Sequence, residues 1–268
     1  MLVTVIIFLR ESLEAAFLVS ILLAISHKYR IPKLWVVIAL GIGFVCSSIS
    51  ASFLGSITNL FDGTGQELMN ATLLMSIVVL VGVVCFRFSP LLYSVVKAGK
   101  GHGLGRSIKY LLIMTVAVAT THEGTELSIY SYAYSQTHES IMILIIGGII
   151  GTGIGASVGA IIYYLLVVIP DKISYRLFLL ILVLIASGMS LQAATYLAQT
   201  GWLPSPPALW NSSSFIPEAS LTGQLLYALF AYEATPNVVQ VGFYLATLLC
   251  YVFLIGFAQW KKRKSVLL

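Results

Sequence analysis

Charged residues are scarce in this sequence. Only 9% of the 268 residues are Asp, Glu, Lys or Arg, whereas soluble globular domains carry about 25%. Hydrophobic residues make up 59% of the chain, and the mean hydropathy is +0.97. This composition argues against a soluble globular enzyme. It predicts an all-α, polytopic membrane protein that is not an enzyme.

Cysteine and nucleotide-binding motifs are also scarce or absent. The three cysteines, Cys46, Cys85 and Cys250, lie in apolar runs without a CxxC pair, so we expect no disulfide framework and no thiolate metal site. The sequence has no ATP-binding motif, and we expect no bound cofactor. The net charge of +5 does not indicate nucleic-acid binding, because the basic residues separate apolar spans and are not interleaved with exposed aromatics.

Long apolar windows predict seven transmembrane helices, each long enough to cross the lipid bilayer. The predicted spans cover residues 2–25, 34–57, 67–87, 109–134, 141–169, 176–199 and 239–260. One long connection, residues 200–238, is rich in proline, serine and tryptophan, and we expect it to form an extracytoplasmic loop.

A short interfacial helix is predicted within this loop, at residues 221–232. Nearby aromatic side chains suit the headgroup zone of a bilayer: Trp202, Trp210 and Tyr227. We expect the loop to act as a cap over the helices, with a surface for a partner protein as the alternative.

The charges of the connecting segments separate by sign. Every Lys and Arg except Arg10 follows the first, third, fifth or seventh span, and residues 261–268 form a basic tail. The other connections hold no Lys or Arg, but they contain carboxylates: Asp62, Glu67, Glu139, Glu218 and Glu233. By the positive-inside rule, the basic side is cytoplasmic, so the N-terminus faces outward and the C-terminus faces inward.

A small group of ionisable residues remains inside the predicted spans. It consists of Arg10, Glu11, Glu14, His122, Glu123 and Glu126. Each charged residue at the middle of a membrane helix costs roughly 2.5–3.5 kcal/mol, and such residues usually line an ion or substrate path. Within each Glu pair the spacing is three residues, so each pair projects from one face of its helix.

This spacing predicts a cation site. Two ExxE faces would surround a cation with up to about eight carboxylate oxygens, which suit hard metal ions. Four Glu residues give a charge of −4 and Arg10 gives +1, so Fe³⁺ would make the site neutral. With a divalent ion, a protonated His122 would supply the missing charge. Simple Arg–Glu pairing is the alternative, but one Arg cannot neutralise four carboxylates.

The two motifs occupy equivalent positions in two halves of the chain. The first three spans, residues 1–87, begin outside, and the next three, residues 109–199, begin inside, so the second triplet is an inverted repeat of the first. The seventh span follows as an addition. Inverted repeats with a site at their interface are a recurring transporter architecture. Glycines every four residues in the fifth span predict close helix packing: Gly147, Gly151, Gly155 and Gly159.

The two motifs resemble those of a known family. Arg10-Glu11-Ser12-Leu13-Glu14 resembles the REXXE motif of the oxidase-dependent iron permeases, which include fungal high-affinity ferric permeases and bacterial EfeU-type iron transporters. His122-Glu123-Gly124-Thr125-Glu126 resembles their second motif, REGxE. The likeness covers nearly the whole chain.

The resemblance implies a permease that moves iron, most simply Fe³⁺, inward across a cell membrane, here a bacterial inner membrane. It implies that Glu11, Glu14, Glu123 and Glu126 bind the ion and that Arg10 balances their charge. It also implies an extracytoplasmic iron-oxidising or iron-binding partner protein.

Two departures from the family pattern leave the choice between Fe³⁺ and Fe²⁺ open. His122 stands where the family has Arg, so the second motif loses a fixed positive charge and gains an imidazole that could bind the ion. Asn70 stands where many members have an acidic residue. At the outer end of the third span, Glu67 is a candidate ligand at the mouth of the path, with an ordinary loop carboxylate as the alternative.

Other functional classes use similar residues. A proton-coupled carrier or exchanger of another cation would need the same carboxylates. A haem-binding quinol enzyme is disfavoured, because His122 is the only histidine clearly inside a predicted span. A di-iron membrane enzyme is disfavoured because the Glu-x-x-His order of that class is missing.

Overall fold

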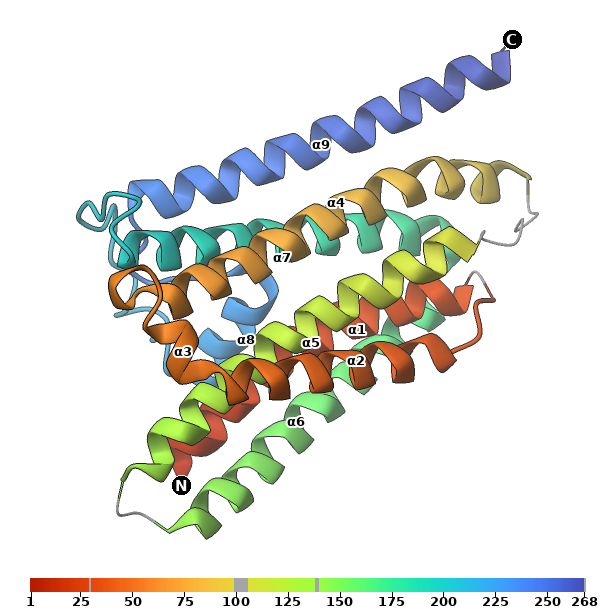
Figure 1. Cartoon of the computed structure of the whole chain (residues 1–268). Coiled ribbons are helices and arrows are strands. Elements are labelled where there is room, and N and C mark those ends of the chain that lie inside the picture. The colour runs from red at the N-terminus through yellow and green to blue at the C-terminus, as the bar shows by residue number, and fades with distance from the viewer. Residues whose placement is uncertain (29, 99–105, 138–139, 268) are drawn as a thin grey trace.

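The structure, a computed structural model, describes residues 1–28, 30–98, 106–137 and 140–267 (Figure 1). The described residues are helical, as predicted, and their only β-type pairing is an isolated bridge between Ala208 and Asn237. The elements are α1 (Leu2–Lys28), α2 (Leu34–Ser52), α3 (Leu54–Thr58), the 3₁₀ helix η1 (Phe61–Gly63), α4 (Gly65–Ala98), α5 (Arg106–Ser135), α6 (Ile141–Val168), α7 (Asp171–Gln199), α8 (Leu221–Phe230) and α9 (Val238–Leu267).

Five of these helices are long and apolar enough to cross a membrane: α2, α4, α6, α7 and α9. Helices α1 and α5 have sufficient length, with 27 and 30 residues. Both of them carry the charged motif residues in the middle of the helix, which sets them apart from the other five. The chain is therefore a multi-pass membrane protein, and two of its long helices bear the motifs.

The long helices pair across the two halves of the chain. Helix α1 packs along α6, α2 along α5, and α4 along α7, while α9 covers α7 and α4 (Figure 1). Helices α1, α2 and α4 of the first half correspond, in order, to α5, α6 and α7 of the second half. When each helix is replaced by its counterpart, the same three pairs are obtained, so the pairing is symmetric between the two halves. The motif helices α1 and α5 also contact each other directly.

Glycine contacts bring the paired helices close together. A Cβ atom added at Gly151 would lie 2.6 Å from the carbonyl oxygen of Val5, so the backbones of α6 and α1 are in direct contact. Further along the same interface, the Ser20 hydroxyl donates to the carbonyl of Gly159 over 2.7 Å. The glycine spacing in this helix thus correctly predicted close packing.

Some helix boundaries differ from the prediction. The predicted second span, residues 34–57, breaks at Phe53, where α2 ends and α3 begins. Helix α4 continues beyond the predicted end at residue 87, as far as Ala98. The break at Phe53 does not follow from a proline, since residues 34–57 contain none, and α4 continues through Pro90.

Helix α8 lies within the short helix predicted at residues 221–232. It packs against α1 and α7, at one end of the bundle (Figure 1), and its position at the membrane interface stays a prediction. The Ser220 hydroxyl accepts a hydrogen bond from the backbone N–H of Gly223 at its start, and Ala231 ends the helix in the left-handed conformation with φ 50°. Tyr227 therefore lies inside the bundle end, whereas Trp202 and Trp210 are exposed.

Candidate functional site

The two Glu motifs meet where α1 and α5 pack together. The carboxyl group of Glu123 lies within electrostatic reach of Glu11, Glu14 and Glu126, and it faces the carboxyl group of Glu11. Glu14 and Glu123 are buried, with 6% and 4% of their surface exposed. The structure therefore gathers the four predicted carboxylates into one group, with Glu14 and Glu123 buried and Glu11 and Glu126 half-buried. This group is called the acidic cluster below.

The carboxylate of Glu14 has two defined partners. Its Oε1 lies 3.5 Å from Nε of Arg10, one helical turn earlier in α1. Its Oε2 accepts a hydrogen bond from Nε2 of Gln192, on α7, over 2.8 Å. Arg10 also lies 4.0 Å from Oε1 of Glu11. A single guanidinium thus compensates two carboxylates of the first motif.

The carboxylate of Glu126 is held by neutral donors. Its Oε1 accepts a hydrogen bond from Nδ2 of Asn70, on α4, over 2.5 Å. The same oxygen accepts a short hydrogen bond from the hydroxyl of Tyr196, on α7. The second motif is therefore stabilised by hydrogen bonds that carry no compensating charge.

The two amide donors occupy equivalent places. Gln192 belongs to the second triplet and donates to Glu14 of the first, whereas Asn70 belongs to the first triplet and donates to Glu126 of the second. Both amides are buried. The sequence did not predict these roles, although an isolated amide inside an apolar span is a signal that could have suggested them.

Several buried oxygens around the cluster lack a hydrogen-bond donor. Among the described residues, both carboxylate oxygens of Glu123, Oδ1 of Asn70 and Oε2 of Glu67 receive no hydrogen bond from an N–H or hydroxyl group. Buried acceptors without donors are costly. A cation or a proton between them would remove this cost, so these oxygens are candidate ligands.

No preformed metal centre is present in the described part of the chain, by the criterion of three or more His, Cys, Asp or Glu side chains arranged around one point. The carboxylates of Glu14 and Glu126 instead bind protein donors. An ion bound by all four carboxylates would have to replace the contact between Arg10 and Glu14. Such an exchange suits an ion that binds and leaves.

His122 lies on α5 directly before Glu123, and only 2% of its surface is exposed. Its Nδ1 atom is buried without a hydrogen-bond partner. The corresponding position in the first motif is Arg10, which is four residues before the second Glu in the same way. The two motifs therefore carry basic residues at equivalent positions, but only Arg10 forms a salt bridge within its own motif.

A polar cavity of about 290 Å³ adjoins the cluster and is called the outer cavity below. Its lining includes Arg10, Gln192, Tyr196, Tyr227, Glu218 and Glu233. The guanidinium carbon of Arg10 lies 3.9 Å from the centroid of the Tyr227 ring, which is a cation–π contact. Arg10 and the two tyrosines thus stand between the outer cavity and the carboxylates.

The two glutamates of the outer cavity come from the long loop between α7 and α9. Oε1 of Glu218 accepts a hydrogen bond from the backbone N–H of Ala234 over 2.6 Å, and Oε1 of Glu233 accepts one from Nε2 of Gln240 over 3.1 Å. Partial burial raises the pKa of Glu233, while the bond from Gln240 opposes this rise. Sequence analysis treated both residues only as loop carboxylates.

Glu67 lies in the first turn of α4, three residues before Asn70 and on the same side of that helix. It is half-buried. Because Asn70 contacts Glu126, Glu67 lies one helical turn away from the acidic cluster along α4. This position is compatible with the predicted role at the mouth of the path.

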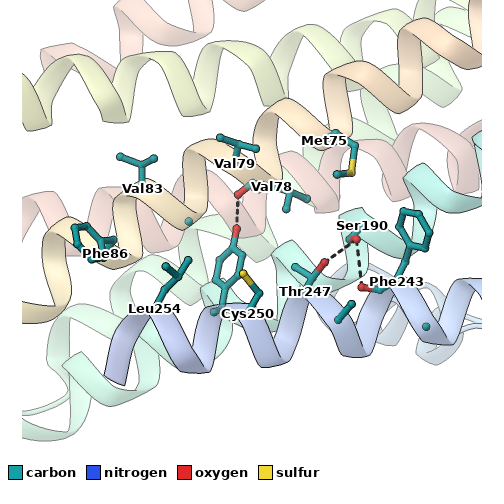
Figure 2. A pocket seen from close by; sticks show the side chains of 14 residues that line it. Met75, Val78, Val79, Val83, Phe86, Ser190, Phe243, Thr247, Cys250 and Leu254 are labelled. Atoms are coloured by element: carbon teal, nitrogen blue, oxygen red, sulfur yellow. Dashed lines mark hydrogen bonds between the residues drawn. The ribbon is translucent and has the colours of Figure 1, made fainter. Parts of the chain in front are cut away.

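A second hollow, of about 880 Å³, lies between α4 and α9 and contrasts with the outer cavity (Figure 2). The residues that line it are mostly apolar and none is charged. Its few polar groups bond to one another: the Thr247 hydroxyl donates to Oγ of Ser190, and Ser190 donates to the carbonyl of Phe243 (Figure 2). The lining of this hollow therefore offers no carboxylate to a cation.

Comparison with known families gave one match. The family model described as the iron permease FTR1 family matches residues 1–266. No curated protein and no solved structure matches the chain. The family match includes both Glu motifs and every helix from α1 to α8.

Proposed function

Because the chain belongs to the iron permease FTR1 family, we propose that it moves iron, as Fe³⁺, inward through the acidic cluster of α1 and α5. The family supports iron as the transported substrate and transport, rather than catalysis, as the activity. The observation that carries the mechanism is the meeting of Glu11, Glu14, Glu123 and Glu126 between two long helices, with Glu123 lacking an N–H or hydroxyl donor.

The proposed topology has seven transmembrane helices. They are α1, α2, α4, α5, α6, α7 and α9, with the N-terminus outside and the C-terminus inside. The separation of basic and acidic connections supports this orientation. The helix pairing and the exchanged amides, Gln192 with Glu14 and Asn70 with Glu126, support an inverted repeat with the ion site at its interface.

Charge balance supports a trivalent ion. When all four carboxylates are ionised, Arg10 leaves the cluster with three uncompensated negative charges, which equal the charge of Fe³⁺. Carboxylate and amide oxygens are hard ligands that suit such an ion. Fe²⁺ would require one additional positive charge, which a proton on a carboxylate or on His122 would supply.

The outer cavity supports a route to the cluster. Glu218 and Glu233 give it a negative charge, which raises the local concentration of cations. An ion that moves inward from there meets Arg10, whose guanidinium must leave Glu14 while it keeps its contact with Tyr227. Glu67 and the free oxygen of Asn70 would bind the ion beside Glu126.

The long extracytoplasmic loop, residues 200–238, supplies both cavity glutamates and is a candidate surface for an iron-oxidising or iron-binding partner protein. Iron delivered there would reach the outer cavity directly. The proposed location of the whole assembly is the bacterial inner membrane.

A proton-coupled cation carrier is the second candidate. The contact between the carboxyl groups of Glu11 and Glu123 favours it, because two facing carboxylates are stabilised by one shared proton. In this mechanism, release of that proton would accompany binding of the ion.

Uptake by purified protein in liposomes tests both candidates. Transport of Fe³⁺, Fe²⁺, Mn²⁺, Cu⁺ and Zn²⁺ is measured with and without an oxidant, and internal pH is followed at the same time. Selective iron uptake that disappears in Glu123→Gln, but persists in the exposed-loop control Asp62→Asn, supports the iron site. Equal transport of all the ions would contradict it and favour the general carrier.

A further inference from the structure

A basic hollow lies where the chain passes from α1 to α2. Its volume is about 630 Å³. The residues that line it are His27, Lys28, Arg30, Ile31, Pro32, Lys33 and Val167. None of these lining residues is acidic. Positive charges therefore gather around one hollow without a carboxylate in its wall.

The basic side chains are arranged around the end of α6. Nζ of Lys28 donates to the carbonyl of Ile169 over 2.6 Å, which ties the end of α1 to the residue after α6. Nζ of Lys33 lies 5.1 Å from the centroid of the Tyr163 ring, and the ring of His27 meets the same ring edge-on at 6.2 Å. These contacts fix the positions of the three side chains around the hollow.

Arg30 completes the basic wall from the connecting segment. It is exposed, and its backbone adopts the left-handed conformation with φ 56°. An anion within the hollow would receive charge-assisted hydrogen bonds from Arg30 and Lys33, and these bonds are about twice as strong as neutral ones. The hollow thus has the chemistry of a phosphate site.

The surface beside the hollow is apolar and exposed. On α6, Leu165 and Val168 are 60% and 82% exposed, and at the start of α2, Leu34 and Val37 are 64% and 66% exposed. Both helices are long and apolar enough to cross a membrane. The hollow therefore lies at the boundary between a lipid-facing surface and a basic, water-facing segment.

We propose that this hollow binds the phosphate of an anionic phospholipid, whose acyl chains lie along the exposed apolar faces of α2 and α6. The adjoining apolar surface favours a lipid over free phosphate, because only a lipid occupies both parts. Basic hollows between membrane helices on the cytoplasmic side are a recurring form of lipid-headgroup site. The proposed ligand does not take part in iron binding.

Native mass spectrometry of the detergent-purified protein tests this site. Dioleoylphosphatidylglycerol and dioleoylphosphatidylcholine are added in turn, with glycerol 3-phosphate and inorganic phosphate as tail-free probes. The test variant is Arg30→Gln with Lys33→Gln. The matched control is Arg176→Gln with Lys261→Gln, which removes the same charge from two exposed residues on the same side.

The wild-type protein and the control should bind phosphatidylglycerol in preference to phosphatidylcholine. The test variant should bind phosphatidylglycerol about ten- to thirtyfold more weakly, as expected for the loss of two basic residues near a lipid headgroup. Monodisperse elution of each variant shows that it is folded. The proposal is overturned if both double variants weaken equally, if both lipids bind equally, or if the tail-free phosphates bind as tightly as the lipid.

Discussion

In α1, the basic residue of the motif, Arg10, contacts Glu14 and the ring of Tyr227, whereas in α5 the equivalent His122 is buried with Nδ1 unpartnered. The second glutamate of each motif receives an amide hydrogen bond from the opposite half. Of these two glutamates, only Glu14 also forms a salt bridge with Arg10. The two halves thus share a pattern of donors, but they differ in charge compensation.

Because of this difference, we expect the two motifs to contribute differently to the binding of a cation and to its release. A cation at the first motif competes with Arg10, while a cation at the second motif competes only with neutral donors. The uncompensated carboxylate of Glu123 is therefore the group whose free energy an ion would lower most. The first motif, in contrast, can exchange the ion for Arg10 and so favour its release.

The largest effect is expected from Glu123→Gln. This change removes the carboxylate that has no compensating donor, so iron affinity should fall by more than about thirtyfold, the equivalent of roughly 2 kcal/mol. Iron uptake into liposomes and direct iron binding measure the loss. Glu11→Gln, the same change in the compensated motif, should have a smaller effect. Equal losses in the two variants would contradict the proposed difference.

Arg10→Gln should affect stability as well as transport. The Arg10 side chain is 38% exposed, but Glu14 is buried. Leaving a buried acceptor without its donor destabilises a protein by about 1–3 kcal/mol, so the melting temperature should fall in the absence of iron. Added Fe³⁺ should restore part of this loss, because it replaces the missing charge. A melting temperature that does not respond to Fe³⁺ would show that the ion does not bind near Arg10.

His122→Arg makes the two motifs alike. The variant should retain Fe³⁺ uptake within about fivefold, a change of roughly 1 kcal/mol, if His122 contributes only charge. Uptake assays with Fe³⁺ and Fe²⁺ in parallel provide the measurement. Complete loss of Fe³⁺ uptake in a stably folded variant would instead show that the imidazole binds the ion directly.

The amide donors should differ in importance. Gln192→Leu removes a hydrogen bond to a charged group, worth about 1.5–3 kcal/mol, and should lower the melting temperature of the iron-free protein. Asn70→Leu should cost less, because the Tyr196 hydroxyl still donates to Glu126. The double change Asn70→Leu with Tyr196→Phe should then exceed the sum of the two single effects. Additive effects would rule out this sharing of donors.

The smallest effect is expected in the outer cavity. Glu233→Gln should lower the uptake rate about twofold at low salt and less at high salt, because it only reduces attraction at a distance. Since the pKa of Glu233 is raised, its side chain becomes neutral at a higher pH than an ordinary Glu. The difference between wild type and variant should therefore disappear as the pH falls through that value. A difference that persists in acid would contradict the role of its charge.

The positions of the long helices could be predicted because apolar runs of sufficient length have few alternative structures in a membrane. The break at Phe53 could not, since the residues around it remain apolar and include no proline. The four glutamates could be assigned to one site from their spacing and the cost of burying charge. The pairing of Arg10 with the glutamates of its own helix was expected. Its contact with the ring of Tyr227 could not be predicted, because these two residues are far apart in the sequence.

The hydrogen-bond partners of the glutamates were harder to predict. An amide such as Gln192 in an apolar helix indicates that a polar partner is near, but its identity depends on the rotation and crossing of α7 and α1. The packing of α8 against α1 also depends on how the long helices are placed, and it could not be predicted from the sequence for that reason. Periodicity alone gives an amphipathic helix and does not distinguish the membrane surface from the end of a helix bundle.

Gly155, on α6, lies opposite Ser12, in the middle of the first motif. A methyl group at this position would lie 2.6 Å from Cβ of Ser12, so α1 would have to shift and would carry Glu11 and Glu14 with it. In the proposed mechanism, the close contact between α6 and α1 would therefore contribute to the spacing between the two motifs. A residue without a side chain, which does not contact the ion, would then help to set the size of the ion that fits there.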